Sequence, residues 1–247
     1  WDARRLWTRL RALVPVRAGI LAVDDTSFPK QGKHSVGVKR QYCGALGKIA
    51  NCQVAVSTLL VGAALAWPLS LELYLPEEWT KDRERCRRAG VPPEVTFRTK
   101  PQLALELIQQ ALADGVQAAP LLGDAVYGDN AGFRSGLRSR GLEFFLQVDP
   151  NKHWGWDHEV PTQLKRSRRH VLPGTPAAQT LTQLTAALPP AAWKSCRWVA
   201  AEGHPRTTRL AWSEVFLRED LRRPQGKLEK LWLVVDWPAG ETQPYHY

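Results

Sequence analysis

The sequence predicts an α/β protein with a β-rich subdomain in its later part, and three observations support this fold class. A short apolar run at residues 20–23 ends in two adjacent acids, as is typical of a strand in an α/β sheet. Further strand-like segments follow without an intervening helix, and helices then alternate with strands up to about residue 150. Beyond this point the chain becomes rich in proline, tryptophan and basic residues. We therefore expect an α/β core that carries a β-rich subdomain.

A helix is predicted at the start of the chain, where leucines recur at helical spacing before Pro15. We interpret residues 1–17 as the end of an N-terminal helical region. The first strand follows and is expected to end at Asp25. Because residues 20–23 are all apolar, this strand is expected to be buried on both faces. Residues 28–35 contain proline and glycine and predict a loop.

The other elements follow from apolar periodicity and from the positions of glycine and proline. The strongest helix is expected to begin at Thr99 and to end before Gly115, since glycine commonly ends helices. The further elements expected in the core are strands at 36–44, 53–61, 120–124 and 143–148, helices at 76–89 and 133–140, and a loop at 125–130. The elements expected later are a helix at 181–188 and strands at 193–201, 209–217 and 231–237.

The composition favours a polyanionic partner. The chain has 34 Lys and Arg against 24 Asp and Glu, which gives a formal net charge of +10. This balance favours nucleic acid over a membrane, although a basic surface that serves only solubility would have the same composition. Neither a long apolar run nor a signal peptide is found, so no membrane association is expected. The four cysteines lack metal-binding spacing and predict reduced, packed thiols of a cytoplasmic protein.

Acids follow two of the predicted strands, about a hundred residues apart in the sequence. Asp24 and Asp25 follow the first strand, and Asp124 follows the strand at 120–124. Carboxylates at the ends of two adjacent strands would suit Mg²⁺, which prefers oxygen ligands. Aspartate also ends strands and starts turns for purely structural reasons, so the same residues fit a role without metal.

A metal-dependent phosphatase of the haloacid-dehalogenase type is one alternative. Gly123, Asp124 and Asp129 are similar to the late acidic loop of that class. Its first two acids, however, are separated by one residue, whereas Asp24 and Asp25 are adjacent. Successive strand residues point to opposite faces, so these two side chains cannot both face one metal in that way.

Blocks of sequence resemble bacterial insertion-sequence transposases in the same order along the chain. The blocks are DDTSFPK (24–30), SVGVKRQYCG (35–44), GKIANCQ (47–53), LYLPEEW (73–79), GVP (90–92) and GDAVYG (123–128). They are similar to the DDE superfamily endonucleases of the insertion-sequence 701 type, from about residue 18 onward. The resemblance implies a ribonuclease-H-like mixed sheet flanked by helices over residues 18–150. A β-rich insertion at 151–229 would follow, and then a strand at 230–247 that leads toward a further part of the core.

The resemblance also implies a catalytic site of two aspartates and one glutamate, which hold two Mg²⁺ or Mn²⁺ ions. Asp25, the acid before Thr26, matches the first aspartate, and Asp124 matches the second. Asp24 is expected to support the site without being a principal metal ligand. The implied partner is double-stranded DNA, at the element's ends and at the target, bound by a homodimer in a synaptic complex. The implied location is the bacterial cytoplasm, with association to the nucleoid when DNA is bound.

The third acid of the family, a glutamate on a helix after the insertion, is expected to lie outside this chain. The sequence begins at Trp1, contains no methionine and stops soon after a strand-like segment, so we expect a fragment. The glutamates near the end of the chain do not lie in a predicted helix, as the third acid of the family does; they are Glu214, Glu219, Glu229 and Glu241. An inactive remnant that binds DNA or inhibits a complete transposase is therefore a second alternative.

Two groups of residues elsewhere are candidates for contacts with DNA. The densest basic cluster consists of Lys165, Arg166, Arg168 and Arg169, which would suit phosphate contacts or else form a solvated loop. Lys39 and Arg40 lie on a predicted core strand and could reach DNA near the acids. Tryptophans crowd the later part of the chain, where a core role is favoured over base stacking.

Overall fold

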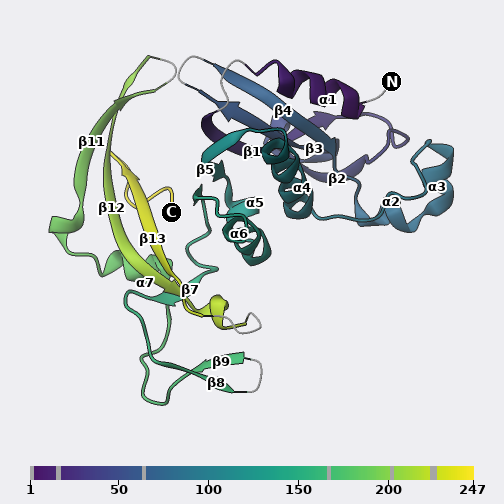
Figure 1. Ribbon diagram of the computed structural model, residues 1–247. Coiled ribbons are helices and arrows are strands. Elements are labelled where there is room, and N and C mark those ends of the chain that lie inside the picture. Colours follow the sequence, from purple (N-terminus) through teal and green to yellow (C-terminus); the bar gives the residue numbers. More distant parts are fainter. Residues whose placement is uncertain (1–2, 15–17, 63–64, 166–167, 201–202, 223–226) are drawn as a thin grey trace. The chain divides into compact units, whose positions relative to one another are not determined.

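The structure is a computed structural model (Figure 1), and it describes residues 3–14, 18–62, 65–165, 168–200, 203–222 and 227–247. The chain forms two compact units, Trp1–Leu146 and Gln147–Tyr247. The boundary expected after residue 150 lies close to this division. Separate sheets organise the two units, which are therefore described one after the other.

The first unit is built on a mixed sheet. Its strands are β1 (Ala18–Pro29), β2 (Lys39–Cys43), β3 (Lys48–Val61), β4 (Ala66–Leu73), β5 (Gln117–Gly123) and β6 (Phe144–Leu146). The order is β2-β3-β1-β5-β6, and β4 pairs with the later part of β3. β3 runs antiparallel to β1, β2 and β4, whereas β5 runs parallel to β1 and β6. Antiparallel strands joined to parallel ones at the centre give a ribonuclease-H-like mixed sheet, so the predicted fold class is confirmed.

Helices flank this sheet. They are α1 (Ala3–Ala12), α2 (Glu77–Lys81), α3 (Arg83–Arg88), α4 (Lys100–Ala113), α5 (Ala125–Gly128) and α6 (Ala131–Arg138). The longest, α4, packs against β3 and β4 (Figure 1). It starts at a capping box between Thr99 and Gln102, and Gly115 follows its end with a φ of 83°. The predicted ends of this helix are confirmed.

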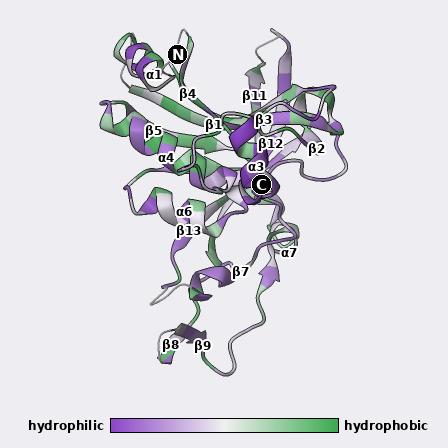
Figure 2. Ribbon diagram, turned by 90° about the vertical axis from the view of Figure 1, so that its right-hand side faces the viewer, coloured by the Kyte–Doolittle hydropathy of each residue, from purple (hydrophilic) through white to green (hydrophobic). Residues whose placement is uncertain are grey.

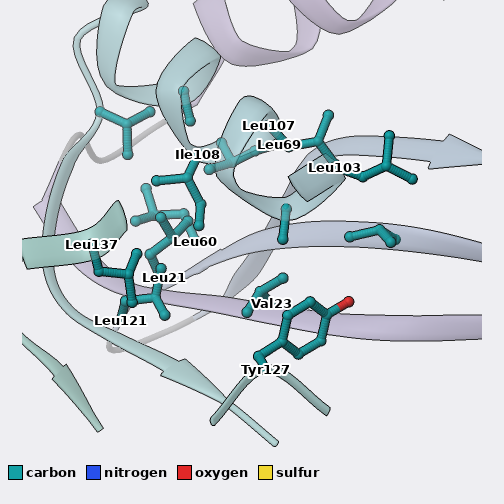
Figure 3. Packing of buried hydrophobic residues seen from close by; sticks show 14 of the residues in the cluster. Leu21, Val23, Leu60, Leu69, Leu103, Leu107, Ile108, Leu121, Tyr127 and Leu137 are labelled. Atoms are coloured by element: carbon teal, nitrogen blue, oxygen red, sulfur yellow. The ribbon is translucent and has the colours of Figure 1, made fainter. Parts of the chain in front are cut away.

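The core of the first unit lies between α4 and the centre of the sheet. Leu103, Leu107 and Ile108 of α4 belong to one buried cluster with Leu21 of β1 and Leu121 of β5 (Figure 3). Hydrophobic residues are prominent along β4 and β5 in Figure 2. This packing fixes α4 against the strands that carry the candidate acids, because well-packed apolar contacts allow little movement.

The first strand differs from its prediction in two respects. β1 continues four residues past Asp25 to Pro29, because it pairs with β3 as far as the Pro29–Cys52 pair. The acids therefore lie within a strand and not at its end. The prediction that this strand is buried on both faces is also wrong, since Leu21 and Val23 are buried whereas Ile20 is 36% exposed. Alternation along the strand leaves one face of this segment accessible.

Three other expectations about local structure are corrected. Strand β4 was not predicted, because its sequence contains Pro68, which usually argues against a strand. Residues 125–130 were expected to form a loop, but Ala125–Gly128 forms the short helix α5. The helix expected at 76–89 is divided into α2 and α3 at Asp82, which caps α3 by accepting a hydrogen bond from the Arg85 backbone N–H.

The second unit is β-rich. Its main sheet contains β7 (Trp154–Trp156), β10 (Gln179–Thr180), β11 (Lys194–Val199), β12 (Pro205–Leu217) and β13 (Lys230–Pro238). The order is β10-β7-β12-β11, and β13 also pairs with β12. Helix α7 (Leu181–Ala186) covers an apolar cluster with Val215, Leu233 and Val235. The strand at 230–238 thus pairs inside this sheet, and its continuation toward a further part of the core stays a prediction.

A separate two-stranded hairpin is formed by β8 (Thr162–Lys165) and β9 (Arg168–Val171) (Figure 1). Lys165, Arg168 and Arg169 of the basic cluster lie in these two strands. Among the helices of the described ranges, none has the length and apolar character needed to cross a membrane.

Candidate active site

The candidate acids lie in, or directly after, two adjacent strands of the first sheet. β1 and β5 are adjacent parallel strands, and Val23 pairs with Gly123 one residue before Asp24 and Asp124. A Cβ atom at Gly123 would lie 3.0 Å from a methyl group of Val23, so the glycine allows close packing here. The two strands are therefore neighbours, and the shared site of their carboxylates stays a prediction.

Asp25 has a hydrogen-bonding partner for each of its carboxylate oxygens. Oδ1 accepts a 2.7 Å hydrogen bond from the Tyr127 hydroxyl, and Oδ2 lies 2.6 Å from Nζ of Lys100. The Asp25 side chain is 16% exposed and shares a strand face with Val23. In Figure 3 the Tyr127 ring lies beside Val23, and its hydroxyl points away from Leu21, Leu121 and Leu137. The carboxylate is thus held in one orientation at the edge of the apolar core.

Asp124 is held by the helix that follows it. It is the N-cap of α5, and its Oδ1 accepts a 2.9 Å hydrogen bond from the Val126 backbone N–H. Desolvation raises the pKa of Asp124, the Val126 hydrogen bond opposes this, and the charges of Asp24 and Asp25 raise the pKa further. The two carboxylates of β1 thus disfavour the charged form of Asp124.

Tyr127 connects the two acids. It belongs to the short helix that Asp124 caps, and its hydroxyl reaches Asp25 on the neighbouring strand. Burial raises the pKa of Tyr127 strongly, and the charge of Asp25 adds to this shift. The hydroxyl therefore remains a hydrogen-bond donor throughout the ordinary pH range.

Asp24 lies on the opposite strand face from Asp25 and is exposed. Its backbone oxygen accepts a hydrogen bond from Ser57 Oγ at 3.1 Å, and its Oδ1 accepts one from the Asp25 backbone N–H at 2.7 Å. Its charge nevertheless acts on Asp124 as that of Asp25 does. Asp24 thus contributes to the electrostatic potential at Asp124 although it lies on the opposite face of β1 from Asp25. Its supporting role in the site stays a prediction.

The acids fit a hard divalent cation. Carboxylate oxygens are the ligands that Mg²⁺ prefers, and a cation between them would offset the repulsion that raises the pKa of Asp124. Asp25 and Asp124 would be the two protein ligands. In the part of the chain that the structure describes, no group of three or more His, Cys, Asp or Glu residues could hold a metal ion. Two carboxylates remain compatible with Mg²⁺, which is commonly completed by water and substrate phosphate.

The predicted DNA-binding residues lie in both units. Lys39 in β2 forms a 2.9 Å ion pair with Glu78, and Arg40 beside it is exposed. Lys165 ends β8, and Arg169 lies in β9. The other two residues of the basic cluster are Arg168, which begins β9, and Arg166, which lies outside the described residues.

The tryptophans are divided between the core and the surface. Trp156 is buried, but Trp198, Trp212 and Trp232 are about half exposed, which corrects the expectation that these rings fill the core. Cross-strand pairing of Trp212 with Val234 and of Trp232 with Glu214 places both rings on one sheet face. The apolar cluster under α7 uses the other face, so these rings remain accessible.

Two residues of the site were missed by sequence analysis, Lys100 and Tyr127. Tyr127 follows Asp124 by three residues. Because a loop was expected there, the helical turn that directs the Tyr127 ring toward Asp25 was not predicted. Lys100 is the first residue of α4, where the helix dipole favours acidic side chains and disfavours a cation. That unfavourable placement was the one available signal that the ammonium group serves another purpose.

The fold and the acids define a structural class, a ribonuclease-H-like sheet with one carboxylate in, and another directly after, two adjacent parallel strands. Comparison with known proteins agrees with this class. The family model of the DDE superfamily endonucleases matches residues 1–221, so the chain belongs to this family.

One similar protein is described as a probable transposase for insertion sequence element IS701, from Microchaete diplosiphon. It is 31% identical to this chain over 206 residues, which cover 75% of this chain and 51% of that protein. The chain thus spans about half the length of this relative. The resemblance found in the sequence is confirmed.

Proposed function

We propose that this chain supplies catalytic residues of an insertion-sequence transposase, which cleaves DNA at the ends of its element and joins them to a target. The observation that carries this proposal is the pairing of β1, which contains Asp25, with β5, which Asp124 directly follows. Membership in the DDE endonuclease family and the likeness to a probable transposase support it. The net charge of +10 suits a DNA partner.

In this proposal Asp25 and Asp124 hold Mg²⁺ or Mn²⁺, with two ions in the complete site. Divalent ions bound there would activate the attacking oxygen and stabilise the charge on the leaving oxygen of a phosphodiester. The chain's own residues orient the ligands: Tyr127 holds Asp25, and the Val126 backbone N–H holds Asp124. Hydrogen bonds of this kind restrict the orientations of the two carboxylates, so that both can bind the same metal ion.

Double-stranded DNA is the proposed substrate, at the element's ends and at the target. We further propose that two copies act together in a synaptic complex in the bacterial cytoplasm, on the nucleoid when DNA is bound. The basic hairpin β8–β9 and the exposed Arg40 are the candidates for phosphate contacts. These contacts would supply affinity without reading the base sequence.

Asp25→Ala and Asp124→Ala, made in a transposase that also contains the third acid expected outside this chain, test the assignment by supercoiled-plasmid nicking in Mg²⁺ or Mn²⁺. Both variants are expected to lose nicking and to keep their affinity for duplex DNA. Asp157→Ala is the matched control, because Asp157 is an exposed aspartate of the second unit. Retained nicking by either variant of the acids would overturn the assignment. Binding of duplex DNA without any nicking by the unaltered chain would favour the alternative of an inactive remnant.

A further inference from the structure

The ammonium group of Lys100 lies beside Asp25, the acid that the proposed function assigns to a metal ion. Its Nζ lies 2.6 Å from Oδ2 of Asp25, and the two side chains are 24% and 16% exposed. A carboxylate so far removed from water requires a compensating charge. In the chain by itself, Lys100 supplies that charge.

This position is not explained by the stability of the helix that carries Lys100. Lys100 is the first residue of α4, where the partial positive charge of the helix N-terminus disfavours a lysine. The capping box formed by Thr99 and Gln102 already satisfies this helix end. The ion pair with Asp25 therefore offsets the unfavourable interaction of the lysine with the helix dipole. The position of Lys100 is thus explained by its contact with Asp25 and not by the stability of α4.

The lysine also has a second contact within reach. Its Nζ lies 5.7 Å from the centre of the Tyr74 ring, a distance at which a cation is attracted to the aromatic face. A lysine side chain is long and flexible, and its ammonium group is a compact charge that binds phosphate as a point contact. The ammonium group of Lys100 can thus separate from Asp25 and still remain within the site, near the Tyr74 ring.

We propose that Lys100 is a phosphate-binding residue of the site, which neutralises Asp25 until a divalent ion binds and then contacts the DNA backbone. The inference rests on the proposed function, since it requires a cation at Asp25. A divalent ion bound to this carboxylate would repel an ammonium group held 2.6 Å from Oδ2. A phosphate of DNA bound at the site would then be a favourable partner for the displaced ammonium.

The proposal predicts opposite effects of one substitution on two ligands. Removing the charge in Lys100→Met removes the competitor of the ion, so Mn²⁺ should bind more tightly, by about fivefold for an ion pair of ordinary strength. The same change removes a phosphate contact, so duplex DNA should bind more weakly in Ca²⁺. Replacement of a lysine that only pairs with Asp25 would leave the affinity for DNA unchanged.

The experiment titrates Mn²⁺ into the chain, follows the free ion by electron paramagnetic resonance, and compares the unaltered protein with Lys100→Met. Lys81→Met is the matched control, because Lys81 forms a 2.9 Å ion pair with Glu77 on α2 and should leave both affinities unchanged. Binding of a 30-base-pair duplex is measured in Ca²⁺ over a range of salt concentrations. Lys100→Met is expected to reduce the slope of log affinity against log salt by about 0.9, the value for one neutralised phosphate, and Lys100→Arg to restore it.

Asp25→Asn separates this inference from the function on which it rests. If Asp25→Asn abolishes Mn²⁺ binding while Lys100→Met leaves it unchanged or weaker, the role of Lys100 is refuted and the metal site stands. If Asp25→Asn leaves Mn²⁺ binding intact, the metal site at Asp25 is refuted, and the role of Lys100 with it. Thermal melting of each variant establishes that the measured proteins are folded.

Discussion

The Tyr127 hydroxyl donates a 2.7 Å hydrogen bond to Oδ1 of Asp25, although the two residues are 102 positions apart in the sequence. Tyr127 lies on the helical turn that Asp124 caps, so this one turn contacts both candidate acids. The orientation of Asp25 is therefore coupled to the end of β5. The coupling gives Tyr127 a positioning role that can be separated from its contribution to the core.

Tyr127→Phe is expected to weaken Mn²⁺ binding roughly tenfold, as the removal of a group that orients a metal ligand commonly does. The ring remains packed, so the free energy of unfolding should fall by only about 1 kcal/mol, the value of one hydrogen bond. Mn²⁺ titration and urea denaturation measure the two effects. Tyr42→Phe is the control, because that hydroxyl lies on an exposed side chain. Equal Mn²⁺ affinities of Tyr127→Phe and the unaltered chain would contradict the positioning role.

The raised pKa of Asp124 leads us to expect that the stability of the chain depends on pH in the absence of divalent ions. Its pKa is raised in the folded chain, so the folded state holds this proton more tightly than the unfolded state does. The contribution of Asp124 to stability is consequently greatest at acidic pH and declines as the pH rises through its raised pKa. Asp124→Asn keeps a capping side chain but carries no charge.

The melting temperature of Asp124→Asn relative to the unaltered chain should therefore increase between about pH 3 and pH 7 in EDTA. Circular dichroism at a series of pH values measures this difference. Asp82→Asn controls for the change of cap, because Asp82 caps the separate helix α3. A difference that is constant with pH, or that falls as the pH rises, would show that the charge of Asp124 is not disfavoured in the folded state.

Sequence reasoning predicted the sheet from local patterns, and it proposed the acids from their places after apolar runs together with the resemblance to transposases. Apolar runs followed by acids predicted the strands that contain Asp25 and end before Asp124. Lys100 and Tyr127 were missed because their contacts with Asp25 depend on how α4 and α5 pack on the sheet, and no spacing in the sequence encodes that packing. Strand β4 was missed because pairing with β3 outweighs the local effect of Pro68.

The basic hairpin predicts the salt dependence of DNA binding. Neutralising Lys165, Arg166, Arg168 and Arg169 to Gln should reduce the slope of log affinity against log salt by about 0.9 for each phosphate that these side chains neutralise. Fluorescence anisotropy with a labelled duplex measures this slope. A charge-matched control neutralises Lys81, Arg83, Arg87 and Arg88, which are exposed on α2 and α3. Equal changes of slope in both variants would mean that net charge, and not the hairpin, determines affinity.

Trp79 is expected to make a large contribution to the stability of the first unit. It is 1% exposed, packs with Val38, Leu75 and Cys86, and donates a 2.8 Å hydrogen bond from Nε1 to the Val38 backbone oxygen. Trp79→Ala should lower the free energy of unfolding by about 3–5 kcal/mol, because it leaves a cavity and an unpaired buried carbonyl. Trp212→Ala removes the same side chain from an exposed sheet face and should cost less than about 1 kcal/mol. Urea denaturation followed by circular dichroism compares the two variants, and equal losses would show that burial does not govern the contribution of these rings.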